Sequence, residues 1–129
     1  MKDLTTAQQA GIVPWSNRLY ETDSYVVFQD RYPVTSGHLL FVPKINYIDS
    51  ILDCYRAAHK HGECLVLQQQ ADGYNVGMNQ SPAAGQTIMY PHIHLIPRRN
   101  GDCEDPVGGV RGVIAGQANY KTPNYKQPS

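Results

Sequence analysis

The sequence predicts an α+β fold, a single domain with an antiparallel sheet of about five strands and one long helix. Three observations support this class. Runs rich in β-branched and aromatic residues come first, a long stretch with helical spacing of apolar residues follows, and strand-like runs then return. The chain has 129 residues, about the length of one domain. Its composition, 41% hydrophobic and 17% charged residues, is typical of a globular protein.

The first strands are predicted to form a hairpin. Strand-like sequence begins near residue 17, and its two clearest runs are Ser24–Asp30 and Gly37–Pro43. The sequence RYPVTS between them contains a proline and small hydroxyl residues, which favour a turn. Ahead of the hairpin, only a short helix near Thr5–Ala10 is expected.

The long helix is predicted over residues 49–72. Apolar residues recur there at spacings of three and four, which is the pattern of an amphipathic helix. Asp49 or Ser50 can cap its start, and Gly73 can end it. Gly62 is a weak point within the helix.

Two further strands are predicted at Tyr74–Met78 and Gln86–Pro97, separated by the turn-rich sequence NQSPAAG. The last stretch has almost no aliphatic residues, so we expect a tail or an arm laid on another surface. The predicted organisation is an N-terminal segment (1–16), a domain (17–114) and a C-terminal arm (115–129).

Composition excludes several classes of function. The 11 basic and 11 acidic side chains balance, which argues against a nucleic-acid partner and a polybasic membrane anchor. No apolar run approaches the ~20 residues that span a bilayer, and the polar N-terminus is unlike a signal peptide. The three cysteines form no C-x-x-C pair, so a disulfide framework is not expected. We therefore expect a cytoplasmic protein.

Two histidines are the strongest candidates for chemistry. His92 and His94 are two apart in a predicted strand, so both leave the same face, with Tyr90 beside them. The apolar residues that alternate with them are Met89, Pro91, Ile93 and Leu95, and we expect these to face the core beneath the helix. The pattern alone leaves two other interpretations open: a pair of surface histidines, or a zinc site that still lacks a third ligand.

The turn before this strand favours a phosphate ligand. The sequence SPAAGQT brings backbone N–H groups, a hydroxyl and amides to the mouth of the histidine strand, from Asn79, Gln86 and Thr87. An imidazole titrates near pH 6.5, so at physiological pH it is largely neutral and nucleophilic. An imidazole beside a phosphate cradle suggests nucleophilic or acid–base chemistry at phosphorus.

These residues carry a family resemblance. The stretch GYNVGMNQSPAAGQTIMYPHIHLIPRRNGD resembles the signature of the histidine triad (HIT) family of nucleotide hydrolases and transferases, H-φ-H-φ-H-φ-φ preceded by G-Q-[ST]. The sequence FQDRYPVTSGHLLFVPK is similar to the family's first block, D-x-x-P-x-x-x-G-H-x-L-x-x-P-K. The resemblance spans residues 17–114 and implies a HIT-like fold and a homodimer whose sheets join across the two-fold axis.

The resemblance also assigns roles to residues. It implies that His92 attacks the α-phosphate of a purine nucleotide and forms a nucleotidyl-histidine intermediate, while His94 contacts the phosphate oxygens. It places Asp30 on the ribose hydroxyls and His38 behind the first histidine of the triad. It also assigns Asn79 and Thr87 to phosphate binding, and Gln86 joins them as a phosphate-binding candidate from the turn sequence.

One departure stands out, because Tyr90 takes the place of the first triad histidine. Its hydroxyl can make a hydrogen bond, and we expect it to meet His38 and help orient the site. Its pKa near 10 prevents proton relay at neutral pH, so activity should be tuned and not abolished. Pro91 makes the local sequence Y-P-H, and the related nucleotidyltransferases carry H-P-H, so transfer to a second acceptor stays open.

The resemblance implies hydrolysis or transfer at a dinucleoside polyphosphate, nucleoside phosphoramidate or adenylate. No cofactor or metal should be required, although a divalent cation can assist. Two rivals remain: a nucleotide-binding regulatory module with little or no turnover, and a metal protein that uses His92 and His94.

Overall fold

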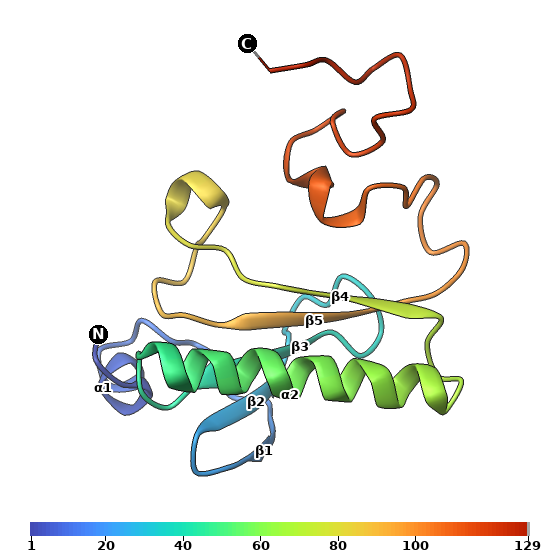
Figure 1. The fold of residues 1–129 in the computed structure, drawn as a ribbon. Helices are drawn as coiled ribbons and strands as arrows, with labels where there is room; N and C mark the ends of the chain where they lie inside the picture. The colour runs from blue at the N-terminus through green and yellow to red at the C-terminus, as the bar shows by residue number, and fades with distance from the viewer. Residues whose placement is uncertain (129) are drawn as a thin grey trace. The chain divides into compact units, whose positions relative to one another are not determined.

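The computed structural model describes residues 1–128 and has the α+β fold that the sequence predicts. Its sheet has five antiparallel strands in the order β1-β2-β3-β5-β4, and one long helix packs on it (Figure 1). The chain divides into two compact units, residues 1–99 and 100–129. The strands and longer helices are α1 (Leu4–Gln9), β1 (Arg18–Glu21), β2 (Tyr25–Gln29), β3 (Leu39–Pro43), α2 (Ile48–Leu67), β4 (Gly73–Gly77) and β5 (Ile93–Arg98).

The central hairpin joins β2 and β3, with a register that runs from Tyr25 opposite Pro43 to Gln29 opposite Leu39. Strand β5 lies between β3 and β4 and pairs with both. The last strand in the sequence, β5, therefore lies inside the sheet, next to β3.

Strand β5 begins at Ile93, so the prediction of a strand from Gln86 is wrong for residues 86–92. Pro91 has no N–H to donate to a ladder. Before it, the chain folds into a turn that the side-chain amide of Gln86 holds together. Its Oε1 accepts from the N–H of Ser81 at 2.7 Å, and its Nε2 donates to the carbonyl of Ile88 at 3.0 Å.

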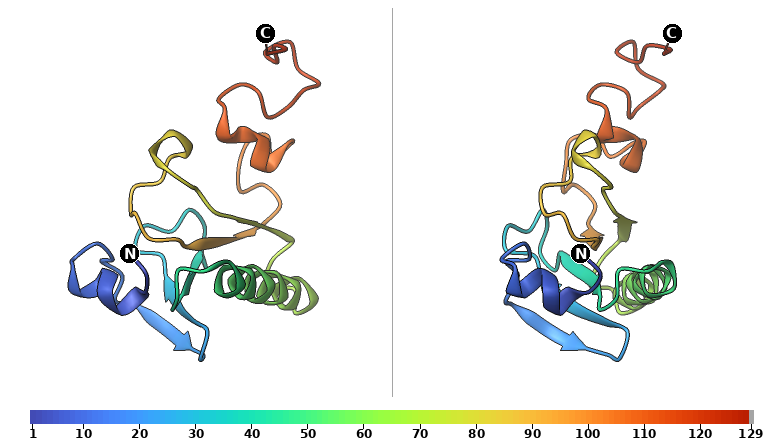
Figure 2. Two further views of the ribbon diagram at one scale, coloured as in Figure 1. Left: turned by 60° about the vertical axis from the view of Figure 1, so that its left-hand side comes forward. Right: turned by 90° about the vertical axis from the view of Figure 1, so that its left-hand side faces the viewer.

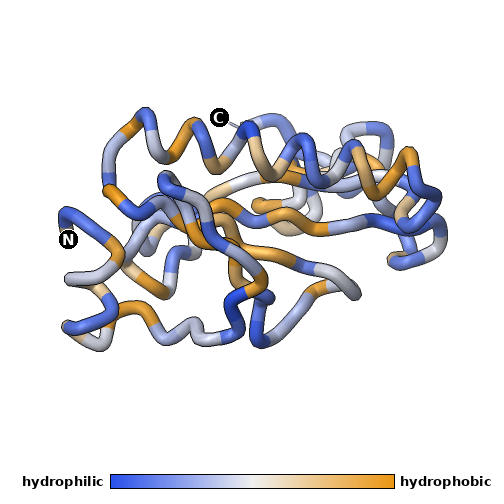
Figure 3. The backbone as a smooth tube through the Cα atoms, turned by 90° about the horizontal axis from the view of Figure 1, so that it is seen from below, coloured by the Kyte–Doolittle hydropathy of each residue, from blue (hydrophilic) through white to orange (hydrophobic). Residues whose placement is uncertain are grey.

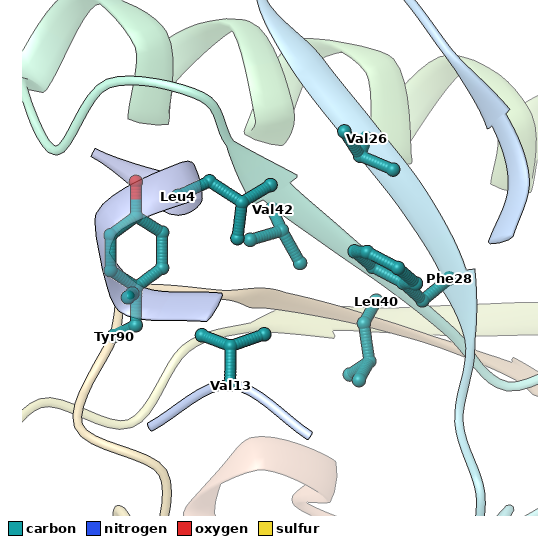
Figure 4. Close-up of a cluster of buried hydrophobic side chains, with 8 residues drawn as sticks. Leu4, Val13, Val26, Phe28, Leu40, Val42 and Tyr90 are labelled. Atoms are coloured by element: carbon teal, nitrogen blue, oxygen red, sulfur yellow. The ribbon is translucent and has the colours of Figure 1, made fainter. Parts of the chain in front are cut away.

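The sheet carries a core on each face. Adjacent residues of a strand point to opposite faces, so Val27 faces α2 while its neighbours Val26 and Phe28 face the N-terminal segment. Helices α1 and α2 lie on opposite sides of the sheet (Figure 2). The α2 side buries Val27, Leu39, Phe41, Cys54, Ala58, Ile93 and Leu95. The other side buries Leu4, Ala7, Val13, Val26, Phe28, Leu40, Val42 and Tyr90 (Figure 4).

Helix α2 is amphipathic, and polar and apolar residues alternate along it in Figure 3. It ends at Leu67, short of the predicted residue 72, because Gln69 adopts a left-handed conformation with φ 59°. Gly62 is required where the helix crosses β4, since a Cβ there would lie 2.6 Å from the ring of Tyr74. No helix within residues 1–128 is both long and apolar enough to cross a membrane.

The second unit is organised around Arg111. Its guanidinium donates to the carbonyls of Ala118 and Gln117, at 3.0 and 3.2 Å, and lies 5.5 Å from the ring centre of Tyr120. Gly108 has φ 91°, and a Cβ there would collide with the carbonyl of Ala118. Hydrogen bonds and cation–π contacts thus order a segment with few aliphatic residues.

Candidate active site

The candidate site lies on the face of the sheet opposite α2. His94 pairs with Leu40 in the ladder, and opposed residues share a face, so its imidazole is directed away from α2. Asp30 directly follows β2 and His38 directly precedes β3. A backbone hydrogen bond of 3.0 Å from Asp30 N–H to the carbonyl of His38 closes the hairpin and brings both side chains to one place.

The ring nitrogens of His38 have distinct roles. The backbone N–H of Val34 donates to His38 Nδ1 at 3.1 Å, so in the neutral ring the proton must lie on Nε2. Nε2 is 2.9 Å from Nδ1 of His94 and 3.4 Å from a carboxylate oxygen of Asp30. His38 therefore donates to His94, which leaves the proton of His94 on its own Nε2. His94 presents a hydrogen-bond donor to a ligand.

His92 has the opposite tautomer to His94. Its Nδ1 is 2.7 Å from the carbonyl oxygen of Tyr90, and a carbonyl only accepts, so Nδ1 carries the proton. The lone pair is therefore on Nε2, the atom that a nucleophile needs. The ring is 7% exposed, and its centre lies 5.1 Å from that of His94 and 4.7 Å from that of Trp15.

Burial keeps all three imidazoles neutral. It lowers the pKa of His92, although the hydrogen bond to Tyr90 and the charge of Asp30 oppose it. Burial also lowers the pKa of His38. For His94, burial together with the positive charge that His92 and His38 would carry lowers the pKa to about 4. At physiological pH, His92 with a free lone pair and His94 with a free N–H are thus both neutral.

This arrangement and the sequence blocks lie within the region that matches a known family, since the HIT domain aligns with residues 14–101. The chain belongs to the histidine triad (HIT) family. It is 33% identical over 93 residues to an adenylylsulfatase of Arabidopsis thaliana, in an alignment that covers 67% of this chain and 47% of that protein. It is 30% identical to a 14 kDa zinc-binding protein of Zea mays, covering 65% and 73%.

Solved HIT structures share the fold. A zinc-bound histidine triad protein from Mycobacterium smegmatis superposes with a TM-score of 0.63, at 29% identity over 76% of each chain. A histidine triad nucleotide-binding protein from Candida albicans gives 0.59, at 26% identity over 78% of this chain and 77% of that one. The family thus includes an adenylylsulfatase and a nucleotide-binding protein. This HIT chain spans about half to two thirds of the length of the first curated relatives that it matches.

Tyr90 does not occupy the place that the sequence predicts for it in this HIT protein. It precedes β5, and its side chain is fully buried in the N-terminal core beside Leu4 and Val42 (Figure 4). Its hydroxyl donates to the carbonyl of Pro43 at 2.7 Å. The predicted contact with His38 is therefore wrong, because that imidazole is bonded to His94. Tyr90 supports the site through its backbone carbonyl instead.

The three loop residues that the sequence predicts to bind phosphate, Asn79, Gln86 and Thr87, differ in their surroundings. Gly77 lies opposite His94, so Asn79, two residues further along, is at the same end of the sheet as His92. Thr87 is exposed on the loop. Both polar ends of the Gln86 side chain bond within the loop, which makes Gln86 a residue that shapes the loop. The prediction that its side chain holds phosphate is not supported by this geometry.

One cluster has the spacing of metal ligands. Ligand atoms of Asp30, His38 and His94 all lie within 4.8 Å of one another. However, the N–H of Val34 keeps the proton of His38 on the nitrogen that would have to bind the ion. A cation would have to displace this proton and break the bond to Val34. We therefore interpret His38 and His94 as a hydrogen-bonded pair with the Asp30 carboxylate beside it.

Sequence reasoning missed Trp15 and Val34. Trp15 packs against His92. The only signal in the sequence that could have pointed to it is that it is the single tryptophan. Val34 acts through its backbone N–H, for which the sequence offers no signal.

Proposed function

We propose that this HIT protein is a nucleotide hydrolase or nucleotidyl transferase that acts at the α-phosphate of a purine nucleotide conjugate through an intermediate on His92. The observation that carries the proposal is the fixed tautomer of His92, whose Nδ1–H is held by the carbonyl of Tyr90 and whose Nε2 keeps its lone pair. A neutral, oriented imidazole needs no separate base to attack phosphorus.

The chemistry takes two displacements. Nε2 of His92 forms a bond to the α-phosphorus while the bond to the leaving group breaks, and the leaving group departs with that electron pair. Where the leaving group is an amine, as in a phosphoramidate, its nitrogen also takes up a proton from solvent. Water then attacks phosphorus, the P–N bond breaks, its electrons return to Nε2, and a proton of the water passes to solvent. The product is a nucleoside monophosphate. A second acceptor in place of water gives transfer, which the Y-P-H sequence also supports.

Donors for the phosphate come from protein groups. The Nε2–H of His94 supplies one hydrogen bond, and Thr87 and Asn79 add a hydroxyl and an amide at the same end of the sheet. Because protein groups supply these hydrogen bonds, the proposed reaction requires no metal, and a divalent cation would act on the outer phosphates of the substrate. Substrates of this kind include dinucleoside polyphosphates, phosphoramidates and adenylates.

The nucleoside is proposed to sit beside Asp30. A hollow of about 210 Å³ there is lined by residues that include Gln29, Asp30 and His38. A second hollow of about 190 Å³ shares Gln29 and reaches Trp15 and Arg31. The Asp30 carboxylate can accept from both hydroxyls of a ribose, and the base would extend toward the second hollow.

We also propose a homodimer and a cytoplasmic location, as in the sequence-based prediction. Strand β4 forms an edge of the sheet, which is where a second copy could continue it. Light scattering at several protein concentrations tests the dimer.

The deciding experiment is intact-protein mass spectrometry after brief mixing with adenosine 5′-phosphoramidate. We expect a gain of one adenylyl group and release of AMP, both lost in His92→Gln. His61→Gln, which alters a half-buried histidine on α2, is the matched control and should keep both. Asp30→Asn should weaken binding of the ribonucleotide more than that of its 2′-deoxy analogue. Tight AMP binding without adduct or turnover would refute the proposed reaction.

That last outcome would favour a second function, a nucleotide-binding regulatory module. The absence of the first triad histidine, with Tyr90 withdrawn into the core, is the observation that favours it.

A further inference from the structure

Trp15 lies against the proposed nucleophile. It belongs to the extended segment between α1 and β1, and its side chain is half-buried. Its ring centre is 4.7 Å from that of His92 at an interplanar angle of 63°, an edge-on contact. Its ring centre also lies 5.9 Å from that of Phe28 of β2. The indole thus connects the nucleophile to the apolar core on that face of the sheet.

The orientation of the buried His92 ring depends on its side-chain contacts. His92 precedes β5, so no ladder hydrogen bonds fix its backbone as they fix that of His94. Its side-chain hydrogen bond to the carbonyl of Tyr90 fixes Nδ1 but does not by itself fix the tilt of the imidazole plane about that bond. A flat, rigid neighbour limits such tilting, because the tilted ring would collide with it. The remaining groups that act on the ring are the imidazole of His94 and the charge of Asp30.

We propose that Trp15 is a positioning residue for His92: its indole holds the imidazole plane so that Nε2 stays directed at the substrate, and it shields the ring from water. The inference rests on the proposed function for its role in catalysis, but the ring contact itself can be tested without any reaction. Burial is the main influence on the titration of His92, and Trp15 is a large apolar neighbour that contributes to it.

The first test is an NMR titration of the His92 ring C–H signals, assigned by their loss in His92→Gln. In Trp15→Ala, water reaches the ring, so the pKa of His92 should rise toward the ordinary value of 6.5. Trp15→Phe keeps an aromatic wall and should lie nearer to the wild type. Val13→Ala is the matched control, because it removes atoms from the same core cluster and should leave the titration unchanged.

An unchanged His92 pKa in Trp15→Ala would overturn the proposal. So would an equal shift in Val13→Ala, since loosening of the core would then explain it. If the adduct forms, the rate of its formation can be measured against pH. The acidic limb of this pH–rate profile should shift with the pKa of His92 in each Trp15 variant. A protein that never forms an adduct refutes the proposed function, while the titration still decides the role of Trp15.

A second test needs no change at position 15. Trp15 is the only tryptophan, so all indole emission reports this contact. A protonated imidazole in contact with an indole quenches its fluorescence. The emission of the wild-type protein should therefore fall as His92 takes up a proton, and this step should be absent in His92→Gln. Emission that stays constant through the His92 titration would overturn the proposal even if Trp15→Ala did not fold.

Discussion

Replacing Tyr90 by phenylalanine separates its structural role from a chemical one. The hydroxyl is buried and donates to the carbonyl of Pro43 at 2.7 Å. Losing a buried hydrogen bond costs about 0.5–1.5 kcal/mol, and leaving the carbonyl unpaired raises the total to about 1–3 kcal/mol. For a domain of this size, 2 kcal/mol corresponds to a fall in Tm of about 6–10 °C. Urea unfolding followed by circular dichroism measures the free energy directly.

The same variant should keep its chemistry. Phenylalanine retains the backbone carbonyl that holds His92, so the rate of adenylyl-adduct formation should stay within about two-fold of the wild type. Tyr47→Phe, at an exposed tyrosine, is the control and should change stability by less than about 0.5 kcal/mol. Unchanged stability with a large loss of adduct in Tyr90→Phe would refute this reasoning, because the hydroxyl would then act on the reacting groups.

Three further outcomes are expected. Gly62→Ala should destabilise the protein by about 1–2 kcal/mol in urea unfolding, since overlap with the Tyr74 ring outweighs the gain in helix propensity; adding Tyr74→Ala should remove the penalty. Because the folded-state pKa values of His38, His92 and His94 lie below 6.5, the unfolded chain binds more protons in acid. The free energy of unfolding should therefore fall as the pH drops from about 7 toward 4, which denaturant titrations at each pH would detect; a flat profile contradicts the burial of the three rings. Treatment with EDTA should leave adduct formation from the phosphoramidate unchanged, and a loss that zinc restores would revive the metal interpretation.

The sequence predicted the paired elements well because their patterns are local. Strands β2 and β3 are short, rich in β-formers and separated by a turn, and both were placed within about two residues. The facing of Ile93 and Leu95 toward α2 followed from simple alternation and is confirmed. Met89, which was expected on the same face, is exposed, because the residues before Ile93 do not form a strand. Alternation failed for Tyr90, because it assumed a strand through Pro91 that does not form. The local pattern of apolar and polar residues does not show that a buried tyrosine donates to a backbone carbonyl far away in the sequence.

The orientation of the two central histidines explains why a motif alone could not define the site. Val34 can only donate through its N–H, and Tyr90 can only accept through its carbonyl, so these two backbone groups set the protons of three imidazoles. The result is a lone pair on His92 next to an N–H on His94, the two functions that displacement at phosphorus needs side by side. Both determining groups belong to the main chain, so the side chains at these positions can vary without disturbing them. By this argument a tyrosine is compatible with the chemistry at position 90, provided that the fold keeps its carbonyl on Nδ1 of His92.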